Sequence, residues 1–514
     1  MMAASREQGR PLLSALLQGI AVVEPALERP VAALSLDSRN LAPGTLFCAL
    51  SGTRRHGMEF AAAAAQQGAA AVLAEPDSHW SADSIRGAGP DLGIPVIPVP
   101  ELSQRLSTLA GRFFGEPSRG LDLIAATGTN GKTSVCQFIA QALDGECPCG
   151  VVGTLGYGFP GQLAPTAHTT PDAIRLQAIL AELRGRGAAA VAMEVSSHAL
   201  DQGRAAGVAV DTAVFTNLTR DHLDYHQDML DYAQAKRRLF HLPGLRHAVL
   251  NADDPFGREI LASLDPAVQP VLYGLNREWR PAADAPRWLR ADRVEPRARG
   301  MQITVCGSWG EGAFSTALLG HFNASNLLAV LAVLRLRGWE LESALARVAQ
   351  VRGVPGRMEC FGVPGQPLVV VDYAHTPDAL EQALTVLREH RPRRLIALFG
   401  CGGDRDRGKR PLMGAVAERL GDRVIVTDDN PRGEDGDHIV DDILAGMQAP
   451  YRTRVQRNRS RAIHDAVRGA VPDDIVLVAG KGHETTQTVG DLVLPFSDRE
   501  QVVEVLSGRG GCGP

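Results

Sequence analysis

The chain has 514 residues, of which 45% are hydrophobic and 22% charged, a composition that excludes an intrinsically disordered protein and is typical of a globular one. At this length about three domains are expected, each large enough for a core of its own. The formal net charge of −5 argues against a general nucleic-acid binder.

The cysteines and the apolar runs predict a cytoplasmic protein. The eight cysteines are scattered, and the close pair Cys147 and Cys149 lacks the spacing of a zinc site. We interpret them as free thiols in a reducing compartment. No uninterrupted apolar run reaches the length of a membrane span, and the leucines of residues 11–23 have helical spacing rather than the pattern of a signal peptide.

The chain divides into three blocks. The first, residues 1–118, contains short strand-like runs, an alanine-rich helix predicted over 60–71 and a second helix over 106–114. The second block covers residues 119–355 and the third covers 356–514. Strands and helices alternate in both, which predicts α/β domains built on mostly parallel sheets.

The second block opens with a pattern that predicts ATP binding. A short apolar strand at 121–126 runs into Gly128-Thr129-Asn130-Gly131-Lys132-Thr133-Ser134 and then into an apolar helix. Backbone N–H groups at the start of such a helix attract phosphates, Lys132 reaches the outer ones, and the Thr133 hydroxyl can bind Mg²⁺. Ala126 stands where the strict P-loop has its first glycine, so this is a tighter variant.

Further strands are predicted at 189–195, 211–216 and 247–250, with a helix over 172–183 and a surface excursion over 276–298. Glu194, at the end of one of these strands, is a candidate Mg²⁺ ligand beside Thr133, because a hard cation prefers carboxylate and hydroxyl oxygens. The alternative is an exposed glutamate at a strand end.

Four more positions of this block are candidates for a site or for an ordinary structural role. His222, in a segment with two histidines and two aspartates, can bind a second metal or orient a phosphate, or it is a solvated loop residue. Lys236, on a helix predicted over 229–239, has the residue type of a solvated helix face. Asn323, at the start of a helix predicted over 323–336, suits a helix N-cap, while Asn326 suits a nucleotide-base contact.

The third block has the clearest alternation. Strands are predicted at 368–371, 395–399, 423–426 and 475–478, and helices at 377–389, 411–420, 438–447 and 459–468. Each strand runs into a polar loop, and ligands of parallel sheets bind beyond the carboxyl ends of the strands. Arg432 offers a planar fork for a carboxylate, while Asp429 and Glu484 can hold an ammonium group. These loops therefore predict a receptor for an amino acid.

Six segments stand together in the order found in one family. They are residues 127–133 (TGTNGKT), 194–198 (EVSSH), 216–226 (TNLTRDHLDYH), 356–359 (GRME), 372–377 (DYAHTP) and 429–432 (DNPR). Over about residues 35–490 the chain resembles the Mur ligases of peptidoglycan synthesis, and most of all the diaminopimelate-adding members. The resemblance implies an α/β fold of three domains: an N-terminal UDP-sugar domain (1–118), a central P-loop ATPase-type domain (119–355) and a C-terminal Rossmann-like domain for the amino acid (356–514).

The resemblance also implies an activity. It is the ATP-dependent joining of meso-2,6-diaminopimelate to UDP-N-acetylmuramoyl-L-alanyl-D-glutamate, through an acyl phosphate and with Mg²⁺. By the same resemblance Lys132, Glu194, His222 and Lys236 are catalytic. Thr133 and Glu194 then bind one Mg²⁺, and His222 with Lys236, carbamylated to N6-carboxylysine, binds a second.

The binding residues implied by the resemblance fall into three sets. The ATP set is Gly128, Thr129, Asn130, Gly131, Lys132, Thr133, Ser134, Asn323, Arg357 and Asp372. The UDP-sugar set is Leu36, Ser38, Thr53, Arg54, Arg55, Thr169, Thr170, Ser196, Gln202 and Arg204. The diaminopimelate set is Arg405, Asp429, Asn430, Pro431, Arg432, Gly480 and Glu484. The chain departs from the family at His168, where the family usually has asparagine, and in the variable segment 53–55.

The choice of amino acid depends on Arg432. Lysine-adding relatives lack this arginine, because lysine has no distal carboxylate to pair with it. The alternatives are a sibling carboxylate–amine ligase, such as a lysine-adding, D-Ala-D-Ala-adding or folylpolyglutamate-forming enzyme, and a catalytically silent nucleotide-binding sensor. A dehydrogenase is disfavoured because the third block lacks a G-x-G-x-x-G turn. We expect a monomer.

Overall fold

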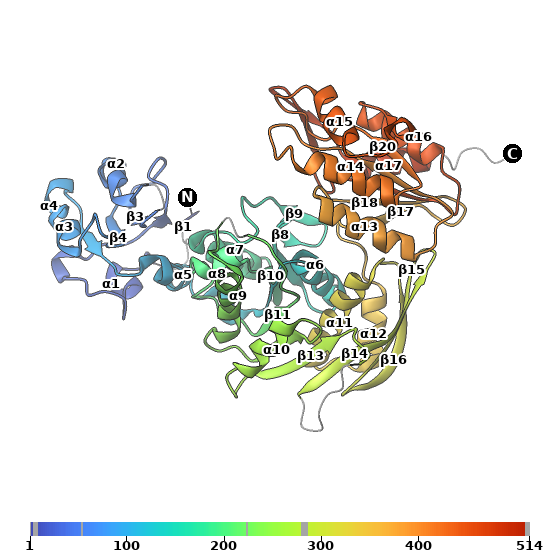
Figure 1. The fold of residues 1–514 in the computed structure, drawn as a ribbon. Coiled ribbons are helices and arrows are strands. Elements are labelled where there is room, and N and C mark those ends of the chain that lie inside the picture. The colour runs from blue at the N-terminus through green and yellow to red at the C-terminus, as the bar shows by residue number, and fades with distance from the viewer. Residues whose placement is uncertain (1, 4–8, 53–54, 223–224, 279–285, 509–514) are drawn as a thin grey trace. The chain divides into compact units, whose positions relative to one another are not determined.

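The computed structural model describes residues 2–3, 9–52, 55–222, 225–278 and 286–508. The chain separates into two compact units, one formed by Met1–Tyr273 with Pro281–Trp288 and the other by Gly274–Arg280 with Leu289–Pro514. Figure 1 follows both units in chain order by colour.

The N-terminal part of the first unit is a small α/β layer. Its strands, in spatial order, are β1 (Met2–Ala3), β2 (Ala33–Ser35), β3 (Thr45–Ala49), β4 (Ala71–Ala74) and β5 (Val96–Pro98), of which β2 to β5 are parallel. Its helical segments are α1 (Leu13–Leu16), η1 (Pro25–Leu27), η2 (Gly57–Phe60), α2 (Ala61–Gln66), α3 (Ala82–Gly87), α4 (Gly89–Leu92), α5 (Leu102–Phe113) and η3 (Pro117–Gly120).

Two helix predictions in this layer need correction at their ends. The helix predicted over 60–71 ends at Gln66, because Gly68 has a left-handed backbone (φ +86°) and residues 71–74 form the buried strand β4. The helix predicted from residue 106 starts four residues earlier, at Leu102, which is fully buried.

A larger, mostly parallel sheet forms the rest of the first unit. In spatial order its strands are β13 (Gln269–Gly274), β12 (His247–Asn251), β11 (Thr212–Phe215), β6 (Asp122–Thr127), β10 (Ala190–Glu194), β7 (Cys149–Gly153), β8 (Gly156–Phe159) and β9 (Gln162–Ala164). The last two continue from β7 as an antiparallel meander. The helical segments are α6 (Lys132–Leu143), α7 (Ala173–Gly185), α8 (Ser197–Asp201), α9 (Met229–Arg237), η4 (Arg238–His241) and α10 (Pro255–Ala262).

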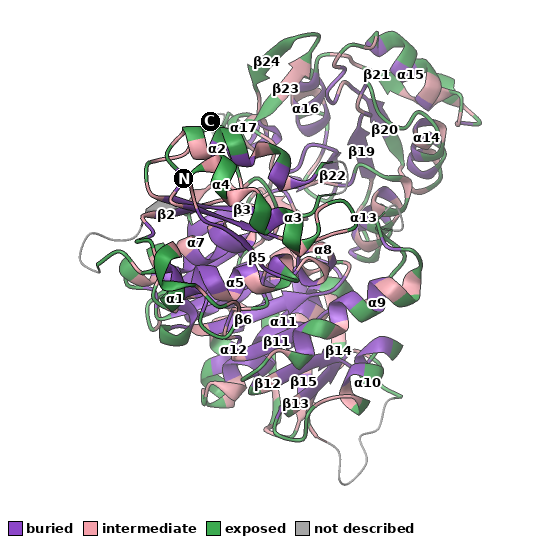
Figure 2. Cartoon of the chain, turned by 90° about the vertical axis from the view of Figure 1, so that its left-hand side faces the viewer, coloured by how far each residue is buried: buried purple, intermediate pink, exposed green. Residues whose placement is uncertain are grey.

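The middle of this sheet confirms the predicted strands. β6 pairs in parallel with both β10 and β11, and all three are buried along nearly their whole length; Figure 2 shows the buried residues in purple. Because the carboxyl ends of parallel neighbours meet at one edge, the loops that begin at residues 128, 195 and 216 emerge side by side.

The second unit begins with an antiparallel ribbon that the sequence did not predict. It comprises β14 (Arg287–Arg297), β15 (Gly300–Gly307) and β16 (Gly310–Thr316). The prediction of a surface excursion over 276–298 is therefore wrong for 287–297, where Leu289 and Ala291 are buried between arginines. Residues 279–285 lie outside the described part. Helices α11 (His321–Leu336) and α12 (Leu341–Ala349) follow.

The C-terminal sheet has every predicted strand and helix. Its spatial order is β17 (Glu359–Phe361), β18 (Leu368–Asp372), β22 (Ile475–Ala479), β19 (Leu395–Phe399), β20 (Arg423–Val426) and β21 (Arg454–Val455), parallel from β18 onward. The helical segments are α13 (Pro377–Glu389), α14 (Lys409–Leu420), α15 (Gly436–Leu444), η5 (Pro450–Arg452), α16 (Arg459–Arg468) and α17 (Asp498–Ser507). Two hydrophobic clusters use alternate residues of the same strands, so helices cover both faces. A hairpin, β23 (Thr486–Val489) and β24 (Leu492–Pro495), stands apart from the sheet and is largely exposed.

The fold class is therefore α/β with mostly parallel sheets, as predicted. None of the helices among the described residues is long and apolar enough to cross a membrane. The cysteines within the described ranges are all free thiols.

Candidate functional site

The loop between β6 and α6 has the geometry of a phosphate cradle. Gly128 and Gly131 have positive φ angles of +150° and +87°, and α6 starts directly at Lys132. A Cβ atom at Gly128 would lie 1.9 Å from Thr216 Oγ1, so only glycine fits there. Lys132 Nζ donates to the carbonyls of Gly128 and Thr129, each at 2.9 Å, which places its charge over the loop.

The segment after β11 holds this cradle in place. Asn217 O accepts a hydrogen bond from Thr129 N (2.8 Å), and Asn217 Oδ1 accepts one from Asn130 N (2.9 Å). Thr216 Oγ1 donates to Asn130 O (2.5 Å). The conformation of the loop is therefore set by a strand almost ninety residues away, as the pairing of β6 with β11 requires.

Glu194 is a buried carboxylate at the end of β10, with 1% of its surface exposed. Oε2 accepts a hydrogen bond from Thr133 Oγ1, and Oε1 accepts one from Thr154 N, both at 2.8 Å. Burial raises the pKa of Glu194, while the nearby Lys132 charge and these hydrogen bonds oppose the rise. The interpretation as an exposed glutamate is wrong, and its pairing with Thr133 supplies the hard oxygen donors that Mg²⁺ prefers.

Lys236 is buried rather than solvated. Only 1% of the residue is exposed, its Nζ donates to Gly128 O (2.9 Å), and the nitrogen lies 4.2 Å from the centre of the Tyr232 ring. Burial first, and then the charge of Lys132, lowers the pKa of Lys236 to about 6. The amine is therefore neutral over most of the physiological pH range.

His222 also lies close to the Tyr232 ring. The centre of its ring is 6.0 Å from that of Tyr232 and 5.0 Å from that of His198, and its backbone is left-handed (φ +53°). Tyr232 also places its hydroxyl 3.2 Å from Thr129 Oγ1, so it links the cradle, His222 and Lys236. Among the residues that the structure describes, no three or more His, Cys, Asp or Glu side chains form a ready metal site.

The central part of the predicted UDP-sugar set is joined by hydrogen bonds. Thr170 Oγ1 donates to Glu194 O (2.9 Å) and accepts from Ser196 N (3.0 Å). Arg204 donates to Thr170 O (2.9 Å) and to Gln202 Oε1 (2.6 Å). Thr169 Oγ1 lies 3.1 Å from Thr154 Oγ1. This set therefore adjoins Glu194, whereas His168 is exposed.

The N-terminal members of that set come from the loop after β2 and from the segment at residues 53–55. Leu36 lines a cavity of about 210 Å³ together with Asp37, Asp172 and Arg175, and Ser38, which is nearly buried, follows it. Arg55 is an exposed side chain paired with Glu59 (2.7 Å). Thr53 and Arg54 lie outside the described residues.

The predicted nucleotide contacts of the second unit are Asn323, Arg357 and Asp372, and each has a different local environment. Asn323 is buried within α11, donating from Nδ2 to Leu319 O (2.9 Å), and the N-cap is Gly320, so the N-cap interpretation is wrong. Asp372 accepts from Met358 N (2.7 Å) and Ala374 N (2.8 Å), and burial raises its pKa. The Arg357 guanidinium lies 4.8 Å above the Tyr373 ring.

The residues predicted to bind an amino acid come together beyond the carboxyl ends of the C-terminal strands. Asp429 and Asn430 are nearly buried, and Asn430 Nδ2 donates to Glu484 Oε2 (3.0 Å). A Cβ atom at Gly480 would lie 2.5 Å from Asp429 Oδ2. Burial alone would raise the pKa of Glu484, but its bond to Lys481 (2.8 Å) helps to hold it below its ordinary value. Burial raises the pKa of Asp429, so among these two carboxyl groups the surroundings favour the ionised form of Glu484.

The two arginines of this set come from neighbouring loops. Arg432 follows Pro431 and donates from Nη1 to Gly403 O (2.8 Å). A Cβ atom at Gly402 would lie 2.8 Å from Arg432 Nη1 and 3.7 Å from Arg405 Cγ, so the two side chains flank this glycine. Arg405 is exposed and Arg432 half-buried, which leaves guanidinium surface open to an anion.

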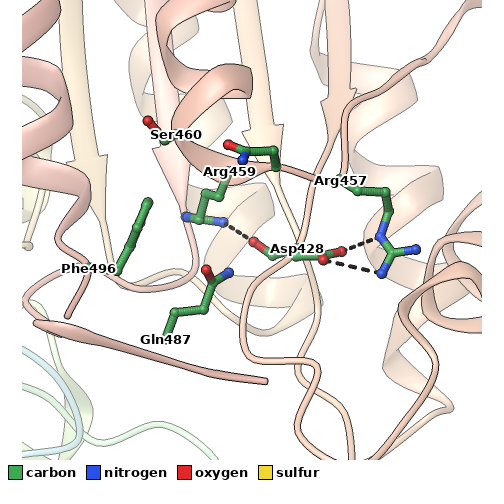
Figure 3. Close-up of a pocket in the computed structure, with 7 residues that line it drawn as sticks. Asp428, Arg457, Arg459, Ser460, Gln487 and Phe496 are labelled. Atoms are coloured by element: carbon green, nitrogen blue, oxygen red, sulfur yellow. Dashed lines mark hydrogen bonds and ion pairs between the residues drawn. The ribbon is translucent and has the colours of Figure 1, made fainter. Parts of the chain in front are cut away.

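A polar cavity of about 300 Å³ lies beside the receptor loop, lined by Asp428, Arg457, Asn458, Arg459, Ser460, Gln487 and Phe496. Figure 3 shows Asp428 between Arg457 and Arg459, joined to both. Arg457 Nε binds the Asp428 carboxylate (2.5 Å), and Arg459, itself paired with buried Asp498 (2.7 Å), donates to Asp428 O (3.2 Å). These contacts brace the residue before Asp429.

Several residues of the site were not predicted. Thr154, Tyr232 and Lys481 each bind predicted site residues. Nothing in the local pattern of Thr154 or Tyr232 distinguishes it from an ordinary loop or helix residue. Only Lys481 had a signal, since it lies between Gly480 and Glu484 in a loop after a strand.

Comparisons with known proteins match consecutive parts of the chain to one family. Three family models match: "Mur ligase family, catalytic domain" at residues 30–114, "Mur ligase middle domain" at 126–334, and "Mur ligase, glutamate ligase domain" at 356–482. A protein of Alkalilimnicola ehrlichii, described as UDP-N-acetylmuramoyl-L-alanyl-D-glutamate–2,6-diaminopimelate ligase, is 50% identical over 97% of this chain and 99% of its own.

Two further matches carry the same description. One is a protein of Pseudomonas aeruginosa, 50% identical over 92% of this chain and 94% of its own. The other is a solved structure, 36% identical, which has a TM-score of 0.72 and covers 94% of this chain and 96% of its own.

The buried amine of Lys236 makes stability depend on pH. In the folded protein it is neutral above about pH 6, whereas an unfolded lysine stays protonated to about pH 10.4. The unfolded state thus binds more protons in this window, so stability rises with pH, by at most about 1.4 kcal/mol per unit. We expect Lys236→Met to abolish this rise and Gln234→Met to keep it, measured by urea unfolding between pH 6.5 and 8.5 in CO₂-free, Mg²⁺-free buffer. Parallel curves for the wild type and Lys236→Met would contradict the burial argument.

Proposed function

Because the chain belongs to the Mur ligase family, we propose that it joins meso-2,6-diaminopimelate to UDP-N-acetylmuramoyl-L-alanyl-D-glutamate while ATP is converted to ADP and phosphate. The observation that carries this proposal is 50% identity over 97% of the chain with a ligase of that description. The cradle at residues 128–134 and the charged receptor around Arg432 support it. We expect the reaction to take place in the cytoplasm, where ATP is supplied.

In the first unit, the proposed role of the cradle is to hold ATP. The N–H groups at the start of α6 and the Lys132 ammonium face the phosphates, and the Thr133–Glu194 pair provides oxygen ligands for Mg²⁺. The metal, when bound, offsets negative charge on the phosphates. The free carboxylate of the D-glutamyl residue can then approach the γ-phosphate, and its attack yields an acyl phosphate and ADP.

Lys236 is proposed to carry a carbamate. A neutral amine can attack CO₂, form a C–N bond and lose a proton, and the lowered pKa of Lys236 keeps its amine in that neutral form. The product is an anionic oxygen ligand beside Tyr232, whose ring also lies close to His222. We propose these two residues as ligands of a second Mg²⁺.

In the second unit, the proposed role of the receptor is to orient diaminopimelate. Asp429 and Glu484 suit an ammonium group, and Arg405 and Arg432 suit the distal carboxylate. The free amine of this substrate must then attack the acyl carbon, so that phosphate leaves from a tetrahedral intermediate. Excluding water at this stage prevents hydrolysis of the acyl phosphate.

Phosphate release is the first test. The purified protein is mixed with ATP, Mg²⁺ and UDP-N-acetylmuramoyl-L-alanyl-D-glutamate, and meso-diaminopimelate is compared with L-lysine. We expect turnover with diaminopimelate and little with lysine, because lysine leaves the two arginines without a partner. Turnover with lysine would reject the proposed specificity, and no phosphate release with either amino acid would reject the ligase.

Arg432→Ala tests the distal contact. Removing one partner of a desolvated charge pair costs roughly 2–5 kcal/mol, so the KM for diaminopimelate should rise by at least about thirtyfold. The KM for ATP should stay within about twofold, as should both values in Arg461→Ala, an exposed arginine of α16. An equal rise for ATP and diaminopimelate in Arg432→Ala would refute the assignment.

Lys236→Ala tests the carbamate. We expect almost complete loss of turnover, and partial recovery when acetate or propionate is added, because a small carboxylate can occupy the space of the carbamate. Gln234→Ala, an exposed change on the same helix, should stay active and not respond to these acids. Full activity of Lys236→Ala would show that the residue has no role in catalysis.

A further inference from the structure

Arg410 is a fully buried arginine between the two loops that carry the receptor arginines. It stands in the first turn of α14, and its two terminal guanidinium nitrogens bind Glu434, with Nη1 to Oε2 at 3.0 Å and Nη2 to Oε1 at 2.9 Å. It also donates to Asp442 Oδ2 (2.9 Å) and Gly402 O (3.2 Å). A bidentate arginine–carboxylate pair is the most directional of charge-assisted hydrogen bonds.

Glu434 also contacts the loop that carries Arg405. Its Oε1 also accepts a hydrogen bond from Asp404 N, and Asp404 Oδ2 accepts one from Gly433 N (3.0 Å). Gly403 N donates to Asn430 O (2.9 Å). The loop at residues 400–408 and the loop at residues 427–435 are therefore joined by direct hydrogen bonds, and Arg410 adds a further link because it binds both Gly402 O and Glu434.

The two loops approach each other so closely at Gly400 and Gly403 that no side chain fits there. A Cβ atom at Gly403 would lie 1.8 Å from Pro431 O, and one at Gly400 would lie 2.1 Å from Thr427 O. Small changes in the separation of the loops would therefore displace the two side chains that flank Gly402, which are Arg405 and Arg432.

Backbone strain on both sides shows that the joint is held by its contacts. Asp404 and Arg432 each have φ of +52°, a left-handed conformation that residues other than glycine rarely adopt. Such conformations persist where surrounding contacts over-determine them. Here the contacts are the bonds through Glu434 and Gly433, together with Arg432 N to Thr488 O (3.1 Å) and Gly490 N to Arg432 O (2.7 Å).

We propose that Arg410 is a positioning residue of the amino-acid receptor. Through Glu434 it fixes the separation of the loops that carry Arg405 and Arg432, and so favours an amino acid with a distal carboxylate. Because Arg410 is fully buried, its proposed effect on the substrate is through the two loops and not by direct contact. This inference rests on the proposed function.

Arg407 offers a matched control. Its guanidinium binds the same Asp442 Oδ2 (3.3 Å) from a position where 65% of the side chain is exposed. Arg407 and Arg410 therefore both bind Asp442, but Arg410 also forms the bidentate pair with Glu434.

The test uses the full chain with Arg410→Met, Arg410→Lys, Glu434→Gln and Arg407→Met. The KM is measured for diaminopimelate, ATP and the UDP-linked substrate, and turnover with L-lysine is measured beside it. We expect Arg410→Met and Glu434→Gln to raise the KM for diaminopimelate tenfold or more and to reduce its preference over lysine. The other two KM values should stay within twofold, Arg410→Lys should be intermediate, and Arg407→Met should match the wild type.

Amide hydrogen exchange gives a readout that does not depend on catalysis. Exchange at residues 402–405 and 431–434 should be faster in Glu434→Gln than in Arg407→Met or the wild type. If Arg410→Met does not fold, Glu434→Gln carries the test, since glutamine keeps the shape and an oxygen for Asp404 N.

The outcomes separate the two proposals. An unchanged KM for diaminopimelate in Glu434→Gln, or an equal rise for all three substrates, overturns the role of Arg410. A wild type without diaminopimelate-dependent phosphate release refutes the proposed function and with it the selectivity. In that case unchanged exchange in Glu434→Gln also rejects the joint between the loops, while faster exchange upholds it.

Discussion

The parallel pairing of strands is the constraint on which the rest of the structure depends. It places consecutive carboxyl ends at one edge of a sheet, so loops far apart in the sequence emerge together. In the first unit β6 lies between β10 and β11, which brings the cradle, Glu194 and Thr216 into contact. The fit is so close that Gly128 and Gly153 have no room for a Cβ atom, which would meet Thr216 and Glu194. The pairing of the strands therefore requires glycine at both positions.

Buried charge is handled in two different ways in this molecule. Arg410 and Arg459 are fully buried, and each remains paired with carboxylates, as an arginine must because it cannot lose its proton in a protein. Lys236 is as deeply buried, but it donates to a carbonyl and sits over an aromatic ring, so burial lowers its pKa to about 6. The chain has only four lysines among its 53 basic residues, at positions 132, 236, 409 and 481. A lysine at position 236 is what allows the proposed carbamate, since an arginine there would stay cationic.

The C-terminal part was largely predictable because its signals are local. Helices over 377–389 and 459–468 have the predicted bounds, the first with Thr376 as N-cap and Pro377 at its first position. Where local signals conflict with packing, prediction failed. Residues 287–297 contain arginines and a proline and were predicted as a surface excursion, but they form a strand whose Leu289 and Ala291 are buried. The helix predicted over 60–71 was too long, because strand β4 begins at residue 71. Helix propensity is a weak preference that tertiary contacts override.

The sequence by itself determined the strands and helices of the C-terminal parallel sheet, the central strands around β6, the cradle at 128–134 and the segments that resemble the Mur ligases. These depend on short-range patterns: apolar runs of strand length, glycine turns and helix caps. Only the tertiary structure decided which charged residues are buried. Lys236 and Arg237 read alike in sequence, as do Arg407 and Arg410, yet Lys236 and Arg410 are buried, whereas Arg237 is partly exposed and Arg407 largely so. The reason is that burial of a charge depends on partners supplied by distant segments, such as Gly128 for Lys236 and Glu434 for Arg410.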